Sequence, residues 1–100
     1  MAIPVEFDAA AREEFDEAFD WYAERSPGAA IGFASEIDAA IEQIAADPKR
    51  FPRTVAGCRR CALRRYPYSL VFYQTASRLI VVAVAHAKRR PAYWRDGRSR

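Results

Sequence analysis

The sequence predicts an α+β fold with the element order β-α-α-β-β-β, in which an N-terminal helical hairpin packs on a small antiparallel sheet. Two stretches of helical hydrophobic periodicity lie in residues 9–46 and are separated by only two or three residues. Residues 59–86 instead carry short apolar runs with a polar turn between the last two. Helices and strands that are segregated along the chain in this way are typical of α+β domains.

The chain opens with a predicted strand and helix. Apolar and polar residues alternate over residues 3–7, and Pro4 restricts this strand to an edge position or to a strand start. Asp8 is the expected N-cap of a helix that runs to about residue 24. Trp21 lies off the apolar stripe of this helix, so we expect it to contact the next element or a partner.

The second helix has clear start and stop signals. Ser26 is the expected N-cap, Pro27 occupies the first helical position, and Asp47 precedes a proline that ends the helix. Its apolar stripe consists of Ala30, Phe33, Ile37, Ile41 and Ile44. The short connection between the two helices predicts an antiparallel hairpin.

The second half of the chain predicts a three-stranded meander. We expect strands over residues 59–65, 68–74 and 79–86, with a turn at 75–78 and with Phe51 anchoring the preceding loop to the core. The last strand is apolar on both faces, so both faces need cover. The helical hairpin covers one face, and we expect a partner or the chain's own tail to cover the other.

Length and composition indicate a single domain over residues 1–96, followed by a frayed basic tail at 97–100. No apolar run approaches the roughly 20 residues of a membrane helix, and the N-terminus has no signal-peptide pattern. We therefore expect a cytoplasmic protein with no membrane partner.

Charge is divided sharply along the chain. Residues 1–48 hold twelve acids and two bases, a net of −10, whereas residues 49–100 hold fourteen bases and one acid, a net of +13. Such asymmetry indicates a charged partner. The alternative interpretation is that acidic helices lie over a basic sheet and partly neutralise it.

Cys58 and Cys61 form a Cys-x-x-Cys pair, but a structural zinc site requires four ligands, and His86 is the only other soft candidate. A redox motif of this spacing would open a helix, whereas this one leads into a predicted strand. We therefore interpret both residues as incidental thiols and expect neither a metal nor a cofactor.

Several motifs, in their order and spacing, are similar to the ParE/RelE toxin superfamily of type II toxin–antitoxin systems. They are Ala18 with Trp21-Tyr22, Pro48 with Phe51-Pro52, Leu63-Arg64 with Tyr66-Pro67-Tyr68, the run 80–86, and Arg89-x-Pro91-x-x-Trp94. The resemblance covers nearly the whole chain. It implies a RelE/ParE-like fold, a toxin role, and a cognate antitoxin that binds and silences the protein.

The superfamily has two main activities. ParE-like members, of the plasmid-stabilisation branch, inhibit DNA gyrase and replication, whereas RelE-like members cut mRNA in the ribosome. The Tyr66-Pro67-Tyr68 entry to a strand and the ending from His86 to Trp94 resemble the ParE-like branch. RelE-like enzymes typically add lysines on the central strands, which this chain lacks. A gyrase inhibitor that is not an enzyme is therefore favoured, with a metal-independent endoribonuclease as the alternative.

These interpretations give three sets of candidate residues. Target contacts are expected from Arg59, Arg60, Arg64, Arg65, Arg89, Arg90, Tyr93 and Trp94. A ribonuclease would use Arg64, Arg65, His86, Arg89 and Tyr93, because arginine forks match phosphate oxygens and histidine or tyrosine can transfer a proton. Antitoxin contacts are expected from Trp21, Val82 and Val84.

Overall fold

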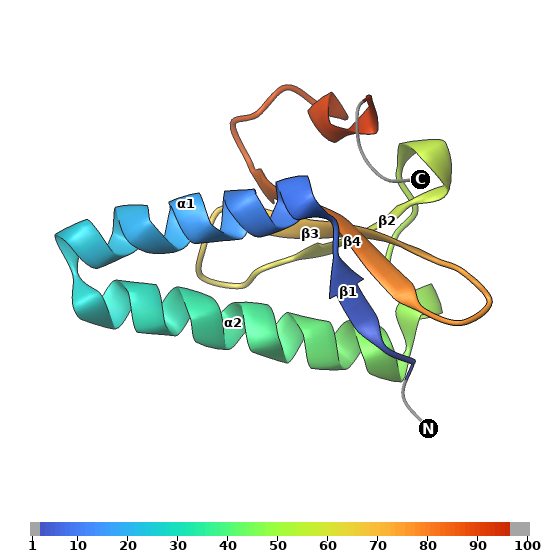
Figure 1. The fold of residues 1–100 in the computed structure, drawn as a ribbon, viewed down its shortest axis with the longest axis horizontal. Helices are drawn as coiled ribbons and strands as arrows, with labels where there is room; N and C mark the ends of the chain where they lie inside the picture. Colours follow the sequence, from blue (N-terminus) through green and yellow to red (C-terminus); the bar gives the residue numbers. More distant parts are fainter. Residues whose placement is uncertain (1–2, 97–100) are drawn as a thin grey trace.

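The predicted order of helices and strands is confirmed by a computed structural model, which describes residues 3–96 (Figure 1). The main elements are β1 (Val5–Phe7), α1 (Ala9–Arg25), α2 (Pro27–Ala46), β2 (Arg59–Ala62), β3 (Tyr68–Gln74) and β4 (Leu79–His86). Three short 3-10 turns complete them, η1 (Pro48–Arg50), η2 (Val55–Gly57) and η3 (Tyr93–Arg95). The predicted basic tail, 97–100, lies outside the described residues.

The two helices begin at the predicted caps. The Asp8 carboxylate accepts a hydrogen bond from the Ala10 amide at 2.8 Å, and the Ser26 hydroxyl accepts one from the Ala29 amide at 3.3 Å. These side chains satisfy amides that have no partner within the helix. Ser26 also ends α1, since its own amide donates to the Tyr22 carbonyl at 2.8 Å. One residue therefore joins the helices and forces them antiparallel.

The sheet has the strand order β1-β4-β3-β2. Strands β2, β3 and β4 form the predicted antiparallel meander, and β1 joins at an edge as expected. The pairing of β1 with β4 is parallel, however, so the sheet is mixed rather than wholly antiparallel. The reason is the helical hairpin, which returns the chain so that β4 runs in the same direction as β1.

A β-bulge in β4 changes which residues face the helices. Phe72 pairs with Val81 and Val71 pairs with Ala83, so Val82 is the extra residue. A bulge of this kind shifts the alternation of side chains by one position. As a result, Val81 and Val84 both belong to the core under the helices, although they are three residues apart.

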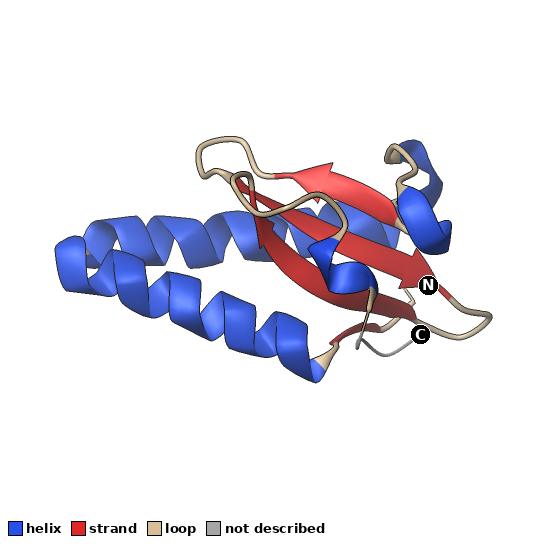
Figure 2. Ribbon diagram, turned by 90° about the horizontal axis from the view of Figure 1, so that it is seen from above, coloured by secondary structure: helices blue, strands red, loops and turns tan. Residues whose placement is uncertain are grey.

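Each face of the sheet has its own hydrophobic core. The core under the hairpin includes Phe33, Ile37, Leu70 and Phe72, whereas the opposite core is formed by Cys58, Val71, Ile80, Val82, Ala83 and Trp94. Figure 2 shows the C-terminal turn in front of the sheet, α2 behind it and α1 along its side. The segments around η2 and η3 thus cover the second face.

This arrangement leaves Val82 and Val84, the β4 residues predicted to contact a partner, with little accessible surface. Their side chains are 0% and 2% exposed, because the chain itself buries them. The segment from Cys58 back to Ala56 supplies cover that the sequence did not reveal. Within residues 3–96, no helix is both long enough and apolar enough to span a bilayer.

Candidate functional site

Two grooves lie on either side of the segment that follows β4. The first, here called the helix groove, has a volume of about 460 Å³ and lies between α1 and the ends of β3 and β4. Its lining includes Glu14, Glu17, Trp21, Tyr22, Tyr68 and His86. Trp21 is 51% exposed, as expected for a residue off the apolar stripe. This groove therefore combines exposed aromatic surface with two carboxylates.

The second, here called the arginine groove, has a volume of about 380 Å³ and lies on the opposite face of the sheet. Its lining includes Arg53, Arg60, Arg89, Arg90, His86 and Tyr93. No acidic side chain of residues 3–96 contributes to this lining. Four arginines from three separate parts of the chain thus converge on one concavity.

Tyr93 connects the two grooves. Its hydroxyl donates a hydrogen bond of 2.6 Å to Oε2 of Glu14, while Oε1 of the same carboxylate accepts one of 3.0 Å from the Val84 amide. The Arg89 guanidinium lies 3.7 Å from the centre of the Tyr93 ring, a cation–π contact. Glu14 on α1 therefore fixes the position of the C-terminal segment and, through Tyr93, of Arg89.

His86 lines both grooves, but one of its ring nitrogens is occupied. Nδ1 accepts a hydrogen bond of 3.0 Å from the Lys88 amide, and the ring packs edge-on against Tyr68 with their centres 4.9 Å apart. Because Nδ1 acts as the acceptor, Nε2 carries the proton in the neutral ring. In this arrangement neither nitrogen of the neutral ring is available as a general base.

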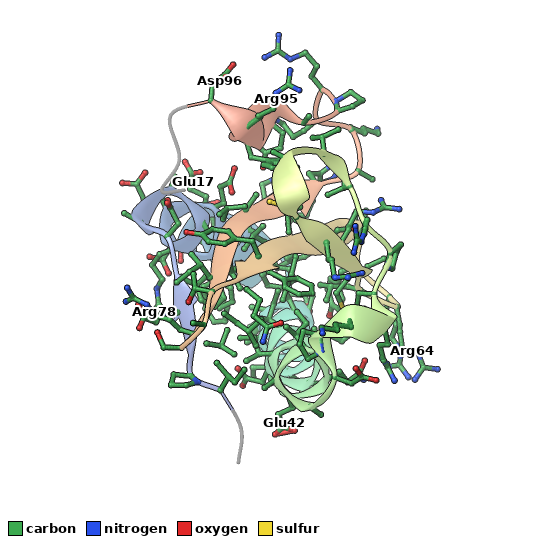
Figure 3. The ribbon with its side chains drawn as sticks, turned by 90° about the vertical axis from the view of Figure 1, so that its right-hand side faces the viewer. Glu17, Glu42, Arg64, Arg78, Arg95 and Asp96 are labelled. Carbon is green, nitrogen blue, oxygen red and sulfur yellow. The ribbon has the colours of Figure 1, made fainter. Side chains whose placement is uncertain are left out.

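Arg64 and Arg65 lie apart from the other predicted target contacts. Their backbone amides donate to Oε1 of Glu36 at 2.9 and 3.2 Å, which ties the β2–β3 connection to α2. Figure 3 shows Arg64 projecting at the side of the molecule, well away from Arg95 in the C-terminal turn. Neither Arg64 nor Arg65 lines the arginine groove.

The remaining predicted target contacts have structural contacts of their own. Trp94 is only 4% exposed and packs in the second core, so it can reach a target only at the base of the arginine groove. Arg59 donates a hydrogen bond of 2.8 Å to the Phe51 carbonyl and faces a smaller pocket with Phe72 and Tyr73. Of the eight predicted residues, the arginine groove thus gathers Arg60, Arg89, Arg90 and Tyr93, with Trp94 at its base.

The tyrosines beside the helix groove are held in a cluster of rings. Tyr22 packs edge-on against Tyr66, and Phe33 lies 5.2 Å from Tyr68 between ring centres. Burial raises the pKa of Tyr22 and of Tyr68 above the usual value, and the neighbouring tyrosine adds to each shift. Both hydroxyls therefore remain protonated at physiological pH.

The two cysteines are buried on opposite faces of the sheet. Cys61 belongs to the core under the helices and Cys58 to the second core. Burial raises the pKa of the Cys61 thiol, opposed by a smaller effect of Arg50. Within residues 3–96, no cluster of three or more histidine, cysteine or acidic side chains is arranged to hold a metal ion.

Two important residues escaped the sequence analysis. Glu14 was not distinguishable from the other acids of α1, because its role depends on partners 70 and 79 positions along the chain. Arg53 lies in a loop, and only its bridge to Arg59 beside β2 brings it to the groove. No signal in the sequence marked Glu14, whereas a run of loop arginines was a weak sign for Arg53.

Comparison with known proteins identifies the family. Residues 5–91 match the family described as the ParE toxin of the type II toxin–antitoxin system, parDE. The chain belongs to the ParE toxin family. A solved structure of the chromosomal ParDE TA system from P. aeruginosa superposes with a TM-score of 0.75 at 18% sequence identity. The match covers 87% of this chain and 98% of that chain. No curated protein matches the sequence.

The family assignment confirms the resemblance seen in the sequence, and the likeness to the solved ParDE structure confirms the expected fold. At this level of identity the structural likeness concerns the fold alone. The toxin–antitoxin role therefore follows from the family match over residues 5–91.

Proposed function

We propose that this ParE-family toxin inhibits DNA gyrase, and thereby replication, and that a cognate antitoxin neutralises it. The observation that supports inhibition over catalysis is the separation of the five residues that a ribonuclease would use. Arg64 and Arg65 are tied to α2, whereas His86, Arg89 and Tyr93 lie at the arginine groove. Inhibition by binding requires a complementary surface but no general base.

The groups at the arginine groove support the same choice. Arginine stays protonated at any working pH and is therefore a poor base. The Tyr93 hydroxyl already donates to Glu14, and the neutral His86 ring carries its proton on Nε2. A proton acceptor for a 2′-hydroxyl is thus missing from the groups described at this groove.

A RelE-like, ribosome-dependent mRNA endoribonuclease is the second candidate. The observation in its favour is that His86, Arg89 and Tyr93 line one groove together with three further arginines. Arginines stabilise the extra negative charge that develops on a phosphate during cleavage. This function would require His86 or Tyr93 to change its hydrogen bonds when RNA binds.

We further propose that the antitoxin contacts the helix groove through Trp21. This side chain is half exposed, and the groove beside it presents the rings of Tyr22 and Tyr68, with buried Ala18 and Val84 at its base. Exposed tryptophans beside a concave apolar surface are common anchors of protein interfaces. Val84 forms part of the groove's base, whereas Val82 lies in the opposite core.

One experiment separates the two proposed activities. The protein is expressed from an inducible promoter without its antitoxin, and DNA synthesis and protein synthesis are followed separately after induction. We expect DNA synthesis to stop first, and we expect the purified protein to inhibit supercoiling by gyrase. Early loss of translation with cleaved mRNA would instead support the ribonuclease, and unaffected growth would contradict both.

The antitoxin contact is tested in the same cells. Co-expression with the antitoxin encoded beside this chain is expected to restore growth, and Trp21→Glu is expected to weaken this rescue while leaving toxicity intact. Ile31→Glu is the matched control, because Ile31 is also exposed, at 67%, but lies outside the helix groove. Equal loss of rescue in both variants would place the antitoxin elsewhere.

A further inference from the structure

The arginine groove concentrates positive charge without neutralising it. The chain contains 13 acidic residues, yet none within residues 3–96 lines this groove. The ion pairs lie elsewhere, between Arg12 and Asp16 and between Arg78 and Glu6. None of the groove's four arginines forms an ion pair with an acidic side chain of the described chain.

Holding like charges together in this way costs electrostatic free energy unless a ligand compensates for it. All four arginines are exposed, so solvent and salt screen part of this cost, and a bound anion would compensate for the remainder. Most acids of the N-terminal half lie on α1 and α2 instead, and Glu14, which reaches the C-terminal segment, is hydrogen-bonded to Tyr93. This cluster of unpaired arginines therefore favours binding of an anionic ligand in the groove.

Specific contacts hold parts of the arginine groove in place. Arg60 projects from β2, next to buried Cys61, and its amide donates a hydrogen bond of 3.0 Å to the Pro52 carbonyl. Arg89 stacks on Tyr93, which Glu14 holds. Arg53 is placed by its bridge to Arg59. The backbone at Arg53 and Arg60 is fixed by strand pairing and the Arg89 side chain by its ring contact, so a ligand would need to order mainly the side chains of Arg53, Arg60 and Arg90.

None of the large hydrophobic side chains that are exposed in residues 3–96 lines this groove. Its large apolar side chains, Val71 and Trp94, are 2% and 4% exposed, so they give no anchor of the kind that stabilises peptide interfaces. Polar groups such as Thr54 and Ser69 lie between the arginines. Arginine forks and hydroxyls together are the usual partners of phosphate oxygens.

We propose that the arginine groove binds the phosphodiester backbone of a single nucleic-acid strand, independently of base sequence. The groove is a local concavity of about 380 Å³, which admits part of one strand at a time. One face of Tyr93 is covered by Arg89, so recognition rests on phosphates rather than on stacked bases. This proposal deepens the proposed function. It rests on that function in one respect only, which is that the strand would be DNA held by gyrase.

The test measures binding of a short fluorescent oligothymidine to the purified full-length chain by fluorescence polarisation, without gyrase, over a series of salt concentrations. Four phosphate contacts predict a slope of about −3 in the logarithm of affinity against the logarithm of salt concentration. The double variant Arg60→Gln with Arg90→Gln is expected to bind at least about tenfold more weakly, with the slope halved, because two contacts are lost.

The matched control is Arg12→Gln with Arg78→Gln, which removes the same charge from two arginines that are already paired at the surface. It is expected to bind within about twofold of the parent, since exposed ion pairs contribute little to stability or to a distant site. Equal weakening of both double variants would mean that only net charge matters and would overturn the proposal.

Two competitors complete the test. If polyglutamate binds more tightly than the oligothymidine, the groove is a site for an acidic protein segment. If duplex DNA binds more tightly than the oligothymidine, the ligand is not a single strand. Either result would overturn the proposal. A supercoiling assay on the same preparations keeps the two inferences separate. Gyrase inhibition without strand binding would contradict only this proposal. Strand binding without gyrase inhibition would contradict only the proposal that gyrase is the target.

Discussion

The helix groove and the arginine groove share His86 and Arg89 but are built by different means. The helix groove is bounded by a rigid helix and by rings that pack on one another, and its charges are mostly negative. The arginine groove is bounded by loops and by an edge strand, and its charges are positive. The two grooves therefore differ mainly in charge and in the exposed tryptophan that only the helix groove has.

The two tryptophans give the strongest test of this contrast. Trp94 supports the arginine groove from the second core, whereas Trp21 lies at the surface of the helix groove. Trp94→Ala is expected to lower the free energy of unfolding by about 3–5 kcal/mol, the usual cost of truncating a buried aromatic side chain. Trp21→Ala should cost less than about 1 kcal/mol. Urea unfolding of both variants measures this difference, and similar values would contradict the assigned burial.

The link between the grooves is tested at Glu14 and Tyr93. A hydrogen bond from a hydroxyl to a carboxylate contributes about 1.5–3 kcal/mol. We expect Tyr93→Phe to lower stability by about that amount or slightly less, because the site is only half buried. A double-mutant cycle with Glu14→Gln should give a coupling energy of about 1 kcal/mol. Additive effects would show that the two grooves are not joined by this contact.

The smallest expected effect concerns alkaline pH and the tyrosines of the helix groove. Burial raises the folded-state pKa of Tyr22 and Tyr68 above the usual tyrosine value of 10.0, so the unfolded chain ionises first. Their contribution is therefore constant below pH 10 and is lost as the pH rises through the folded values. Thermal unfolding should show this decline, and Tyr22→Phe with Tyr68→Phe should reduce it. An unchanged decline would assign it to other groups.

Local signals predicted most of the fold. The caps at Asp8 and Ser26 and the strands β3 and β4 depend on short stretches of sequence, and the structure confirms them. The parallel pairing of β1 with β4 depends on how the hairpin returns the chain, so a pattern of apolar residues did not determine it. The strand predicted over 59–65 ends at Ala62, because Glu36 binds the amides of Arg64 and Arg65.

The candidate site was less predictable, since it depends on which side of the sheet each residue reaches. Arg60 and Arg64 are four residues apart, yet one lines the arginine groove and the other is tied to α2. Trp94 lies in a basic segment and was expected to contact the target, but the second face of the sheet needed cover, and Trp94 helps to supply it. The residue types of this segment alone did not show which side chains line the groove and which belong to the core beneath it.

The contacts of Glu14 also bear on the order in which the protein becomes complete during synthesis. They join α1 to Val84 and Tyr93, which are separated from it by 70 and 79 residues. Contacts over such distances form late, because long loops must close first. The helical hairpin can form while the chain is still being made, but the arginine groove needs residues near the C-terminus. A nascent chain would therefore present its helices before its basic surface exists.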